Sequence, residues 1–296
     1  MRYLVETALL WGMGTVFRVL PERASLFLGK ITGRSLYYVT PGRRNLSLDN
    51  IRQAFAGEFD EKKIRETALN SFGSLGMNVA EFFRLPDLTL EDVERYTSIK
   101  GEDNLAEAMA SGNGVLVLSS HLGSWDMLSA GLALRGYPLS LITKVSKSAA
   151  LNRIWMGYRR QLGMELLMGR GTMKECLRDL KKGRMVGFAL DQNARRSEGV
   201  FIPFFGREAC TITSLALMAR RTGVPVLPIY IYREGDMHRI VIDEPIIHDN
   251  IKDAETDIFE RTRAYVEWTE KVIREHPEQW TWLHDRWKTR PKGELT

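Results

Sequence analysis

The sequence predicts an α/β fold, with a mostly parallel central sheet flanked by helices and with N-terminal membrane-associating helices. Short runs of β-branched and aliphatic residues alternate with helical stretches, which is typical of a parallel sheet. An uncharged run near the N-terminus, followed by a segment of aromatic and basic residues, indicates the membrane-associating helices. The chain has 296 residues, 44% hydrophobic and 27% charged, so it can bury a large core and is neither disordered nor fibrous.

The N-terminal segments have the composition of helices that lie on a membrane. Residues 7–17 carry no charge, but this run is too short to cross a bilayer as a helix, which takes about 20 residues. It is also a poor signal peptide, because no small-residue cleavage site follows it. Residues 24–39 combine aliphatic and aromatic side chains with Lys30 and Arg34, as in a helix of the lipid headgroup layer. Two ordinary surface helices of a soluble domain are the alternative.

Positive charge is concentrated in two parts of the chain. Residues 1–44 hold seven basic and two acidic side chains, and residues 144–196 hold thirteen basic and four acidic ones. Such blocks suit phosphate-bearing partners, such as an anionic membrane surface or an acidic carrier protein. Nucleic acid is excluded because the second block has few aromatic residues for base stacking. We expect residues 1–40 to form the membrane-associating appendage and residues 41–296 one α/β domain.

Regular elements follow after residue 60. Apolar residues recur at helical spacing from Ile64 to Phe82, which predicts a helix that ends before Pro86 and serves core packing alone. Residues 115–118 read Val-Leu-Val-Leu after a glycine-rich turn, which is typical of a buried parallel strand. Further strands are predicted at residues 139–143, 165–168, 185–190, 200–203, 226–232 and 239–242, and further helices at 104–111, 127–135, 149–162, 173–182 and 213–221.

A histidine and a carboxylate follow the strand at 115–118. Residues 119–126 read Ser-Ser-His-Leu-Gly-Ser-Trp-Asp, which places His121 at the end of the strand and Asp126 beyond it. On one continuous helix these two side chains would point about 140° apart, so the chain must bend between them. If a helix begins near Gly123, Asp126 lies in its first turn and reaches back to the imidazole. A carboxylate there would fix one ring nitrogen and leave the other as a base.

The H-x-x-x-x-D spacing of His121 and Asp126 after a buried strand resembles the signature of the lysophospholipid acyltransferase superfamily. The sequence His-Leu-Gly-Ser-Trp-Asp resembles the motif of one branch of this superfamily, the bacterial lipid A biosynthesis (lauroyl/myristoyl) acyltransferases. Further matches follow in the expected order, at Arg44-Asn45-Leu46, Ala54-Phe55, 78–82, Asp191-Gln192, 201–206, 277–280 and 286–288. One departure concerns Asp126, because the lipid A branch often carries Glu there and the glycerolipid acyltransferases usually carry Asp. The identity of the acceptor is therefore open.

The resemblance implies a specific reaction and a set of partners. The enzyme would move a fatty acyl chain from a thioester, carried by acyl carrier protein or coenzyme A, to a hydroxyl of a membrane lipid, with a lipid A precursor as the expected acceptor. His121 would act as general base, oriented by Asp126, while amides around Gly123 and Ser124 would bind the substrate and its developing oxyanion. No cofactor beyond the thioester is expected. The implied location is the cytoplasmic face of the bacterial inner membrane, as a peripheral or monotopic protein.

Further residues complete the candidate site. Asp191 follows the strand at 185–190 and should lie at the same sheet edge as the histidine, in a polar role near the active site or as a turn cap. Phe204 and Phe205 are expected to form a wall of the acyl pocket. Four arginines are candidates for binding phosphate, because the guanidinium fork suits bidentate contacts: Arg170, Arg195, Arg196 and Arg207. Solvated surface charge is the alternative for each of them.

Two other features of the sequence are assigned to structure. The two cysteines, Cys176 and Cys210, have no partners at metal-ligand spacing, so neither a metal site nor a disulfide is expected. His284 and the nearby Trp280, Trp282 and Trp287 are expected to form a packed C-terminal cap. The alternative places these tryptophans at a membrane interface.

Several other classes of protein fit less well. A serine hydrolase would need a G-x-S-x-G nucleophile motif, and a dinucleotide-binding enzyme would need a G-x-G-x-x-G turn after a strand. Neither motif occurs in the sequence. A non-catalytic membrane-binding protein of this fold would explain the N-terminal segments but not the histidine motif. Acylation of a different glycerolipid or glycolipid by the same chemistry is the remaining alternative.

Overall fold

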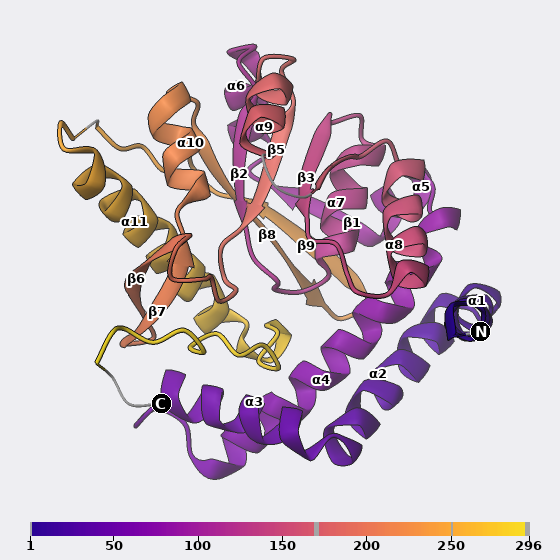
Figure 1. Cartoon of the computed structure of the whole chain (residues 1–296). Coiled ribbons are helices and arrows are strands. Elements are labelled where there is room, and N and C mark those ends of the chain that lie inside the picture. The colour runs from indigo at the N-terminus through magenta and orange to yellow at the C-terminus, as the bar shows by residue number, and fades with distance from the viewer. Residues whose placement is uncertain (1, 169–171, 250, 294–296) are drawn as a thin grey trace.

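A central seven-stranded sheet organises the protein, for which the computed structural model describes residues 2–168, 172–249 and 251–293 (Figure 1). The strands are β1 (Thr97–Lys100), β2 (Val115–Ser119), β3 (Leu139–Thr143), β4 (Glu165–Met168), β5 (Met185–Ala189), β8 (Val226–Glu234) and β9 (Met237–Ile242), in the order β1-β9-β8-β2-β5-β3-β4. Strands β8, β2, β5, β3 and β4 are mutually parallel, whereas β9 is antiparallel to β8 and parallel to β1. The predicted mostly parallel sheet is therefore confirmed.

Helices cover both faces of this sheet. One face carries α5 (Leu90–Tyr96), α6 (Glu102–Ala110), α7 (Trp125–Leu134) and α8 (Ala149–Gln161), and the other carries α9 (Thr172–Leu180), α10 (Ser214–Thr222) and α11 (Ala254–Glu275). Side chains of β2 alternate between the two cores, with Val115 and Val117 in one and Leu116 and Leu118 in the other. This explains why the strand is apolar at every position of that run.

A third layer covers the carboxyl ends of the parallel strands. It contains α3 (Pro41–Ala54), α4 (Glu61–Arg84), a hairpin of β6 (Gly199–Phe204) and β7 (Arg207–Ile212), and the C-terminal segment with the short helix η2 (Pro277–Gln279). The expectation that residues 200–203 join the central sheet is wrong, because β6 pairs with β7 alone in a separate antiparallel sheet. Phe72, Phe204, Trp280 and Trp282 are buried in the core of this layer.

Helix α4 has a buried polar stripe beside its apolar one. Asp60 caps the helix by accepting a 2.7 Å hydrogen bond from the Lys63 amide, and η1 (Leu85–Asp87) follows its end. The buried polar residues recur at helical spacing: Thr67, Ser71, Ser74, Asn78 and Glu81. Val79 of the predicted apolar stripe is 36% exposed instead. The expectation that this helix serves core packing alone is therefore wrong.

Helices α1 (Arg2–Val19) and α2 (Glu22–Val39) lie at one side of the molecule and pack on α4 (Figure 1). The contact between α2 and α4 is backbone to backbone: a Cβ added at Gly33 would lie 2.1 Å from the Phe72 carbonyl oxygen. Phe17 of α1 stacks on Phe83 of α4, with ring centroids 6.1 Å apart. Among the described residues, no helix has both the length and the apolar composition of a bilayer span.

Candidate active site

The sheet topology brings His121 and Asp191 together. Strands β2 and β5 are parallel neighbours, and their register places Ser119 opposite Ala189. His121 and Asp191 each lie two residues beyond these paired positions, so both follow the carboxyl ends of adjacent strands. The prediction that Asp191 shares a sheet edge with the histidine is confirmed.

Asp191 binds both the backbone and the side chain of His121. Its Oδ1 lies 2.9 Å from the imidazole Nδ1, and its Oδ2 accepts a 2.8 Å hydrogen bond from the His121 amide. The indole Nε1 of Trp280 donates a third hydrogen bond, of 2.8 Å, to the same Oδ2. An ionised carboxylate only accepts hydrogen bonds, so Nδ1 must carry the ring proton of the neutral imidazole. The lone pair is then on Nε2.

Asp126 does not contact the imidazole, which corrects the expected pairing. It lies in the first turn of α7, as predicted, but its Oδ1 accepts hydrogen bonds of 2.8 and 2.6 Å from the Nε and Nη2 of Arg159 on α8. The guanidinium of Arg159 also lies over the Trp155 ring, 4.5 Å from its centroid. Arg159 therefore holds the Asp126 carboxylate. The carboxylate that orients His121 is that of Asp191, which follows β5.

The Nε2 of the imidazole lies near Gln192. The His121 side chain is 27% exposed, whereas the Asp191 side chain is buried. The Gln192 amide nitrogen lies 3.3 Å from Nε2, so it can donate to the lone pair. The Trp125 ring meets the imidazole edge-on, with centroids 5.2 Å apart. The imidazole thus lies between an amide and an aromatic ring.

The electrostatics of the pair favour a charged imidazolium. Burial by itself would lower the pKa of His121, but the adjacent Asp191 carboxylate outweighs it, so the pKa lies above its usual value. Burial likewise opposes ionisation of Asp191, yet the charge and hydrogen bonds of His121 hold the pKa of that carboxyl well below its usual range. Asp191 is therefore ionised at neutral pH and stabilises a proton on the ring.

The Gly123 amide, expected to bind the oxyanion, has a partner within the protein. The Gly123 amide donates a 3.0 Å hydrogen bond to the Gln279 carbonyl, so it is not available to an oxyanion. Gly123 has a φ of +58°, and an added Cβ would lie 2.2 Å from the Ile231 carbonyl oxygen. Both residues are buried. They fix the shape of the loop behind His121.

The predicted residues Phe204, Phe205 and Arg207 make contacts within the third layer. Phe204 and Phe205 are buried in an aromatic cluster with Phe55, Trp280 and Trp282, so they belong to the core and do not form a pocket wall. Arg207 binds the side-chain oxygen of Gln53 on α3. Arg170 lies outside the described residues.

The C-terminal residues form the packed cap that the sequence predicts. Trp280, Trp282 and Trp287 are all buried, which excludes the alternative of a tryptophan anchor at a membrane interface. The Nε2 of His284 accepts a 2.9 Å hydrogen bond from the Asn193 amide, so this histidine supports the loop after Asp191. Arg286 is fully buried; it donates to the Cys210 carbonyl at 2.8 Å, and burial lowers its pKa to about 10.

Sequence reasoning did not assign four residues that the structure places around the histidine. Gln192 lay within a recognised motif but received no role, and Trp280 was assigned only to the C-terminal cap. Thr281 donates a 3.1 Å hydrogen bond from its hydroxyl to the His121 carbonyl. Arg159 is one of the thirteen basic residues at 144–196, and nothing in the sequence singled it out from the others. The only signal for Gln192 was its position directly after Asp191 at a strand end.

The site as a whole can activate a hydroxyl group. It contains a base whose Nε2 lone pair lies beside the Gln192 amide, and a buried carboxylate that stabilises the protonated base. His121 and Asp191 thus supply a base and an orienting carboxylate.

Comparisons with known proteins identify the family of the chain. A family model described as bacterial lipid A biosynthesis acyltransferase matches residues 1–289. The chain is 28% identical over 280 residues to the lipid A biosynthesis palmitoleoyltransferase of Escherichia coli, covering 93% of this chain and 88% of the relative. It is 26% identical to the lauroyltransferase of the same organism, covering 95% and 92%. It is also 27% identical to the phosphatidylinositol mannoside acyltransferase of Mycobacterium tuberculosis, covering 73% and 69%.

Proposed function

The chain belongs to the bacterial lipid A biosynthesis acyltransferase family, and we propose that it transfers a fatty acyl chain from a thioester to a hydroxyl of a lipid A precursor. It is an acyltransferase, and its relatives are named for lipid A and for phosphatidylinositol mannoside. A lipid A precursor is preferred as acceptor because the lipid A relatives align with most of the chain. The donor is acyl carrier protein or coenzyme A, and no metal or other cofactor takes part.

The contact that carries this proposal joins the His121 Nδ1 to the Asp191 Oδ1. The Nε2 of His121 removes the proton of the acceptor hydroxyl while its oxygen attacks the thioester carbonyl. A carbon–oxygen bond forms, and the tetrahedral intermediate then expels the thiolate as the carbon–sulfur bond breaks. The imidazolium returns the proton to the departing sulfur. General-base assistance of this kind contributes about 10²–10⁴-fold to the rate.

Two further groups support the charges that develop in this reaction. Asp191 stabilises the imidazolium, because it is buried and already ionised. The Gln192 amide beside Nε2 donates a hydrogen bond to the developing oxyanion, taking the role expected of the Gly123 amide. The Asp126–Arg159 pair fixes α7 against α8 next to the histidine loop.

The N-terminal helices provide the membrane contact in this proposal. Most of the large exposed hydrophobic side chains of the described residues lie on α1 and α2, and several are at least 66% exposed, such as Leu9, Val19, Phe27 and Val39. Leu9, Met13 and Val16 share one face of α1, and Phe27, Ile31 and Tyr38 share one face of α2, since their spacing is helical. Exposed apolar faces with basic residues nearby suit a peripheral position on the cytoplasmic face of the inner membrane.

Product identification tests this function directly. Purified protein is incubated in detergent-dispersed lipid with labelled acyl donors on acyl carrier protein or coenzyme A, and the products are identified by mass spectrometry. Separate reactions contain a lipid A precursor, a phosphatidylinositol mannoside or a lysophospholipid. The proposal predicts an acylated lipid A precursor in the reaction with the wild-type protein and none with His121→Ala. Acylation of only one of the other lipids would contradict the proposed acceptor, and no product from any donor would contradict the proposed function.

A further inference from the structure

The polar stripe of α4 contacts the segments that surround His121. Ser71 donates a 2.8 Å hydrogen bond from its hydroxyl to the Trp280 carbonyl. Two turns further along the helix, Asn78 donates from its side-chain amide to the Gly123 carbonyl, at 2.5 Å. The same residue, Gly123, donates its amide to Gln279 at 3.0 Å. The loop behind His121 is thus held by α4 on one side and by the C-terminal segment on the other.

Glu81 is the only acidic member of this stripe among the described residues, and an arginine and a histidine contact it. Its Oε1 lies 2.6 Å from the Nη2 of Arg233 and 2.7 Å from the Nε2 of His238. All three side chains are buried to nine tenths or more. Burial opposes ionisation of Glu81, but the charges of Arg233 and His238 hold its pKa well below the usual range. A carboxylate is therefore present at this position throughout the working pH range.

Arg233 connects Glu81 to the C-terminal segment. The Arg233 amide donates a 2.7 Å hydrogen bond to the Gln279 Oε1, and the Gln279 Nε2 donates a 2.9 Å bond to the Arg233 carbonyl. The backbone carbonyl of that same Gln279 accepts the Gly123 amide. A continuous series of contacts therefore runs from Glu81 through Arg233 and Gln279 to the loop that carries His121.

Two unpaired polar atoms mark the place where Glu81 meets this loop. The Oε2 of Glu81 and the Ser124 hydroxyl are both buried, and neither has a hydrogen-bond partner. The Ser124 hydroxyl is nevertheless close enough to contribute to the low pKa of Glu81. Buried polar groups are rarely left unsatisfied, so a small movement that joins these two atoms would be favourable.

We propose that Glu81 is a positioning residue for catalysis: its carboxylate, through Arg233, Gln279 and the Ser124 hydroxyl, fixes the loop that places His121 against Asp191. The proposal rests on the function proposed above, in which His121 is the base. Glu81 itself lies behind the loop and does not touch the substrate. Its effect on the reaction is therefore an effect on the position of the imidazole.

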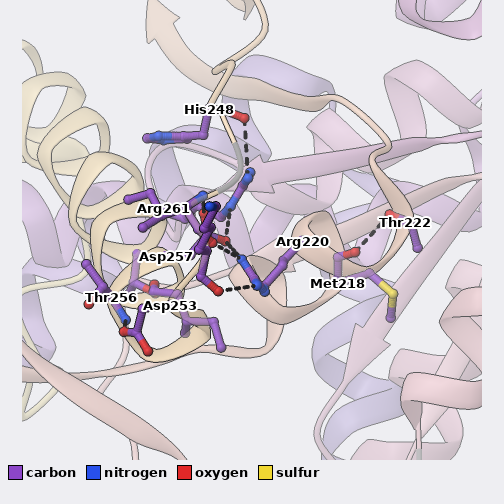
Figure 2. A network of polar contacts seen from close by, with 12 residues as sticks. Met218, Arg220, Thr222, His248, Asp253, Thr256, Asp257 and Arg261 are labelled. Atoms are coloured by element: carbon purple, nitrogen blue, oxygen red, sulfur yellow. Dashed lines mark hydrogen bonds and ion pairs between the residues drawn. The ribbon is translucent and has the colours of Figure 1, made fainter.

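The test compares Glu81→Gln with a matched variant elsewhere in the protein. Asp257 of α11 is also a buried carboxylate with two basic partners, the Arg261 Nε at 2.8 Å and the Arg220 Nη1 at 2.9 Å (Figure 2). Its partners lie on α10, on α11 and in the segment that precedes α11. Asp257→Asn removes the same charge from a similar environment but leaves the His121 loop untouched. It separates a loss of stability from a loss of position.

Two measurements on the full-length protein decide the outcome. The first is an NMR titration of the His121 imidazole, assigned by comparison with His121→Gln. The second is kcat and KM for acyl transfer, measured below the unfolding temperature of each variant. We expect Glu81→Gln to lower kcat by about 10²-fold with KM nearly unchanged, since a displacement of about 1 Å has this effect. We also expect it to lower the pKa of His121, because the contact with Asp191 loosens. Asp257→Asn should change neither.

The contrary outcomes are equally specific. A Glu81→Gln protein with wild-type kcat and a wild-type His121 titration overturns the proposal. If Glu81→Gln fails to fold, the double variant Glu81→Gln, Arg233→Met is used, because it removes the unpaired buried arginine. A low kcat and an altered His121 titration are again expected. Wild-type values of kcat and of the titration again overturn the proposal. Should the wild-type protein transfer no acyl group, the proposed function fails, whereas the NMR titration still decides whether Glu81 positions His121.

Discussion

The Nδ1 of His121 lies 2.9 Å from the Oδ1 of Asp191, although 70 residues separate the two in the sequence. This contact makes Asp191 the orienting carboxylate of the site. Asp126, which is much closer to the histidine in sequence, is held by Arg159 instead. The division of roles between the two carboxylates determines how their variants should behave.

Asp191→Asn should reduce activity more than Asp126→Asn. The first change removes the charge that stabilises the imidazolium and can place an amide donor against Nδ1, which favours the wrong tautomer. The second leaves the His121–Asp191 contact in place and weakens the pairing of Arg159 behind it. We expect a loss of kcat of at least about 10²-fold for Asp191→Asn and a smaller loss for Asp126→Asn. If steady-state kinetics show a larger loss of kcat for Asp126→Asn than for Asp191→Asn, Asp126 is the orienting carboxylate and the account is wrong.

The pH dependence of the reaction should report the raised pKa of His121. The base acts in its neutral form, so the rate falls as the pH drops through the pKa of the imidazole. Because Asp191 raises this pKa, the acid limb of kcat/KM should lie above the ordinary histidine value of about 6.5. In Asp191→Asn, burial remains while the negative charge is lost, so the limb should move to lower pH. A limb that stays in place in this variant would show that another group titrates.

Membrane binding should depend on the exposed faces of α1 and α2. Deleting residues 1–38 is a poor test of this, because α2 packs on the backbone of α4 and its removal would uncover the core. Phe27→Glu or Leu9→Glu changes only an exposed side chain. Each should weaken binding to anionic phospholipid vesicles by about tenfold or more, since burying one such side chain is worth roughly 1.5–3 kcal/mol.

The control for this prediction is Ile247→Glu, which changes an exposed isoleucine between β9 and α11. It should bind vesicles as the wild-type protein does in a co-sedimentation assay. High salt should release part of the wild-type protein, because it screens the basic residues of the N-terminal helices. Equal binding by all three variants would place the membrane contact on another surface.

The close contact between α2 and α4 should make Gly33 sensitive to substitution. In Gly33→Ala the new methyl group would lie 2.1 Å from the Phe72 carbonyl oxygen, so the helices must separate. We expect a loss of roughly 1–3 kcal/mol in the free energy of unfolding. Gly12→Ala on α1 has no atom within 4 Å of the new Cβ and should leave the stability unchanged or raised. Thermal unfolding of the two variants measures the difference, and equal midpoints would contradict the packing.

The parallel strands were predictable because their signal is local. The central strand β2 is a short apolar run buried on both faces, and β3 and β4 have the predicted bounds. Strands β1 and β7 and the 22-residue helix α11 were not predicted. In α11, charged residues are frequent and several of its buried positions are polar, such as Asp257 and Thr269, so its buried face has a weak apolar pattern.

The partners of His121 could not be predicted in the same way. Spacing along the chain pointed to Asp126, but the sheet brings Asp191 to the ring and α8 brings Arg159 to Asp126. Such contacts depend on which strands are neighbours, and a single sequence does not state this. The polar stripe of α4 was overlooked for a related reason: a polar helix face is assumed to meet water, whereas Asn78 and Glu81 meet the interior.

The most direct test of the central claim is a single-turnover measurement of acyl transfer by the wild-type protein and by His121→Ala. The enzyme is in excess over the acyl donor, and the product is followed by mass spectrometry. Circular dichroism and thermal unfolding first establish that the variant is folded. If His121 is the base that Asp191 orients, the variant should lose at least about 10²–10⁴-fold in the rate of the chemical step. A folded His121→Ala protein that transfers the acyl chain at nearly the wild-type rate would contradict the account.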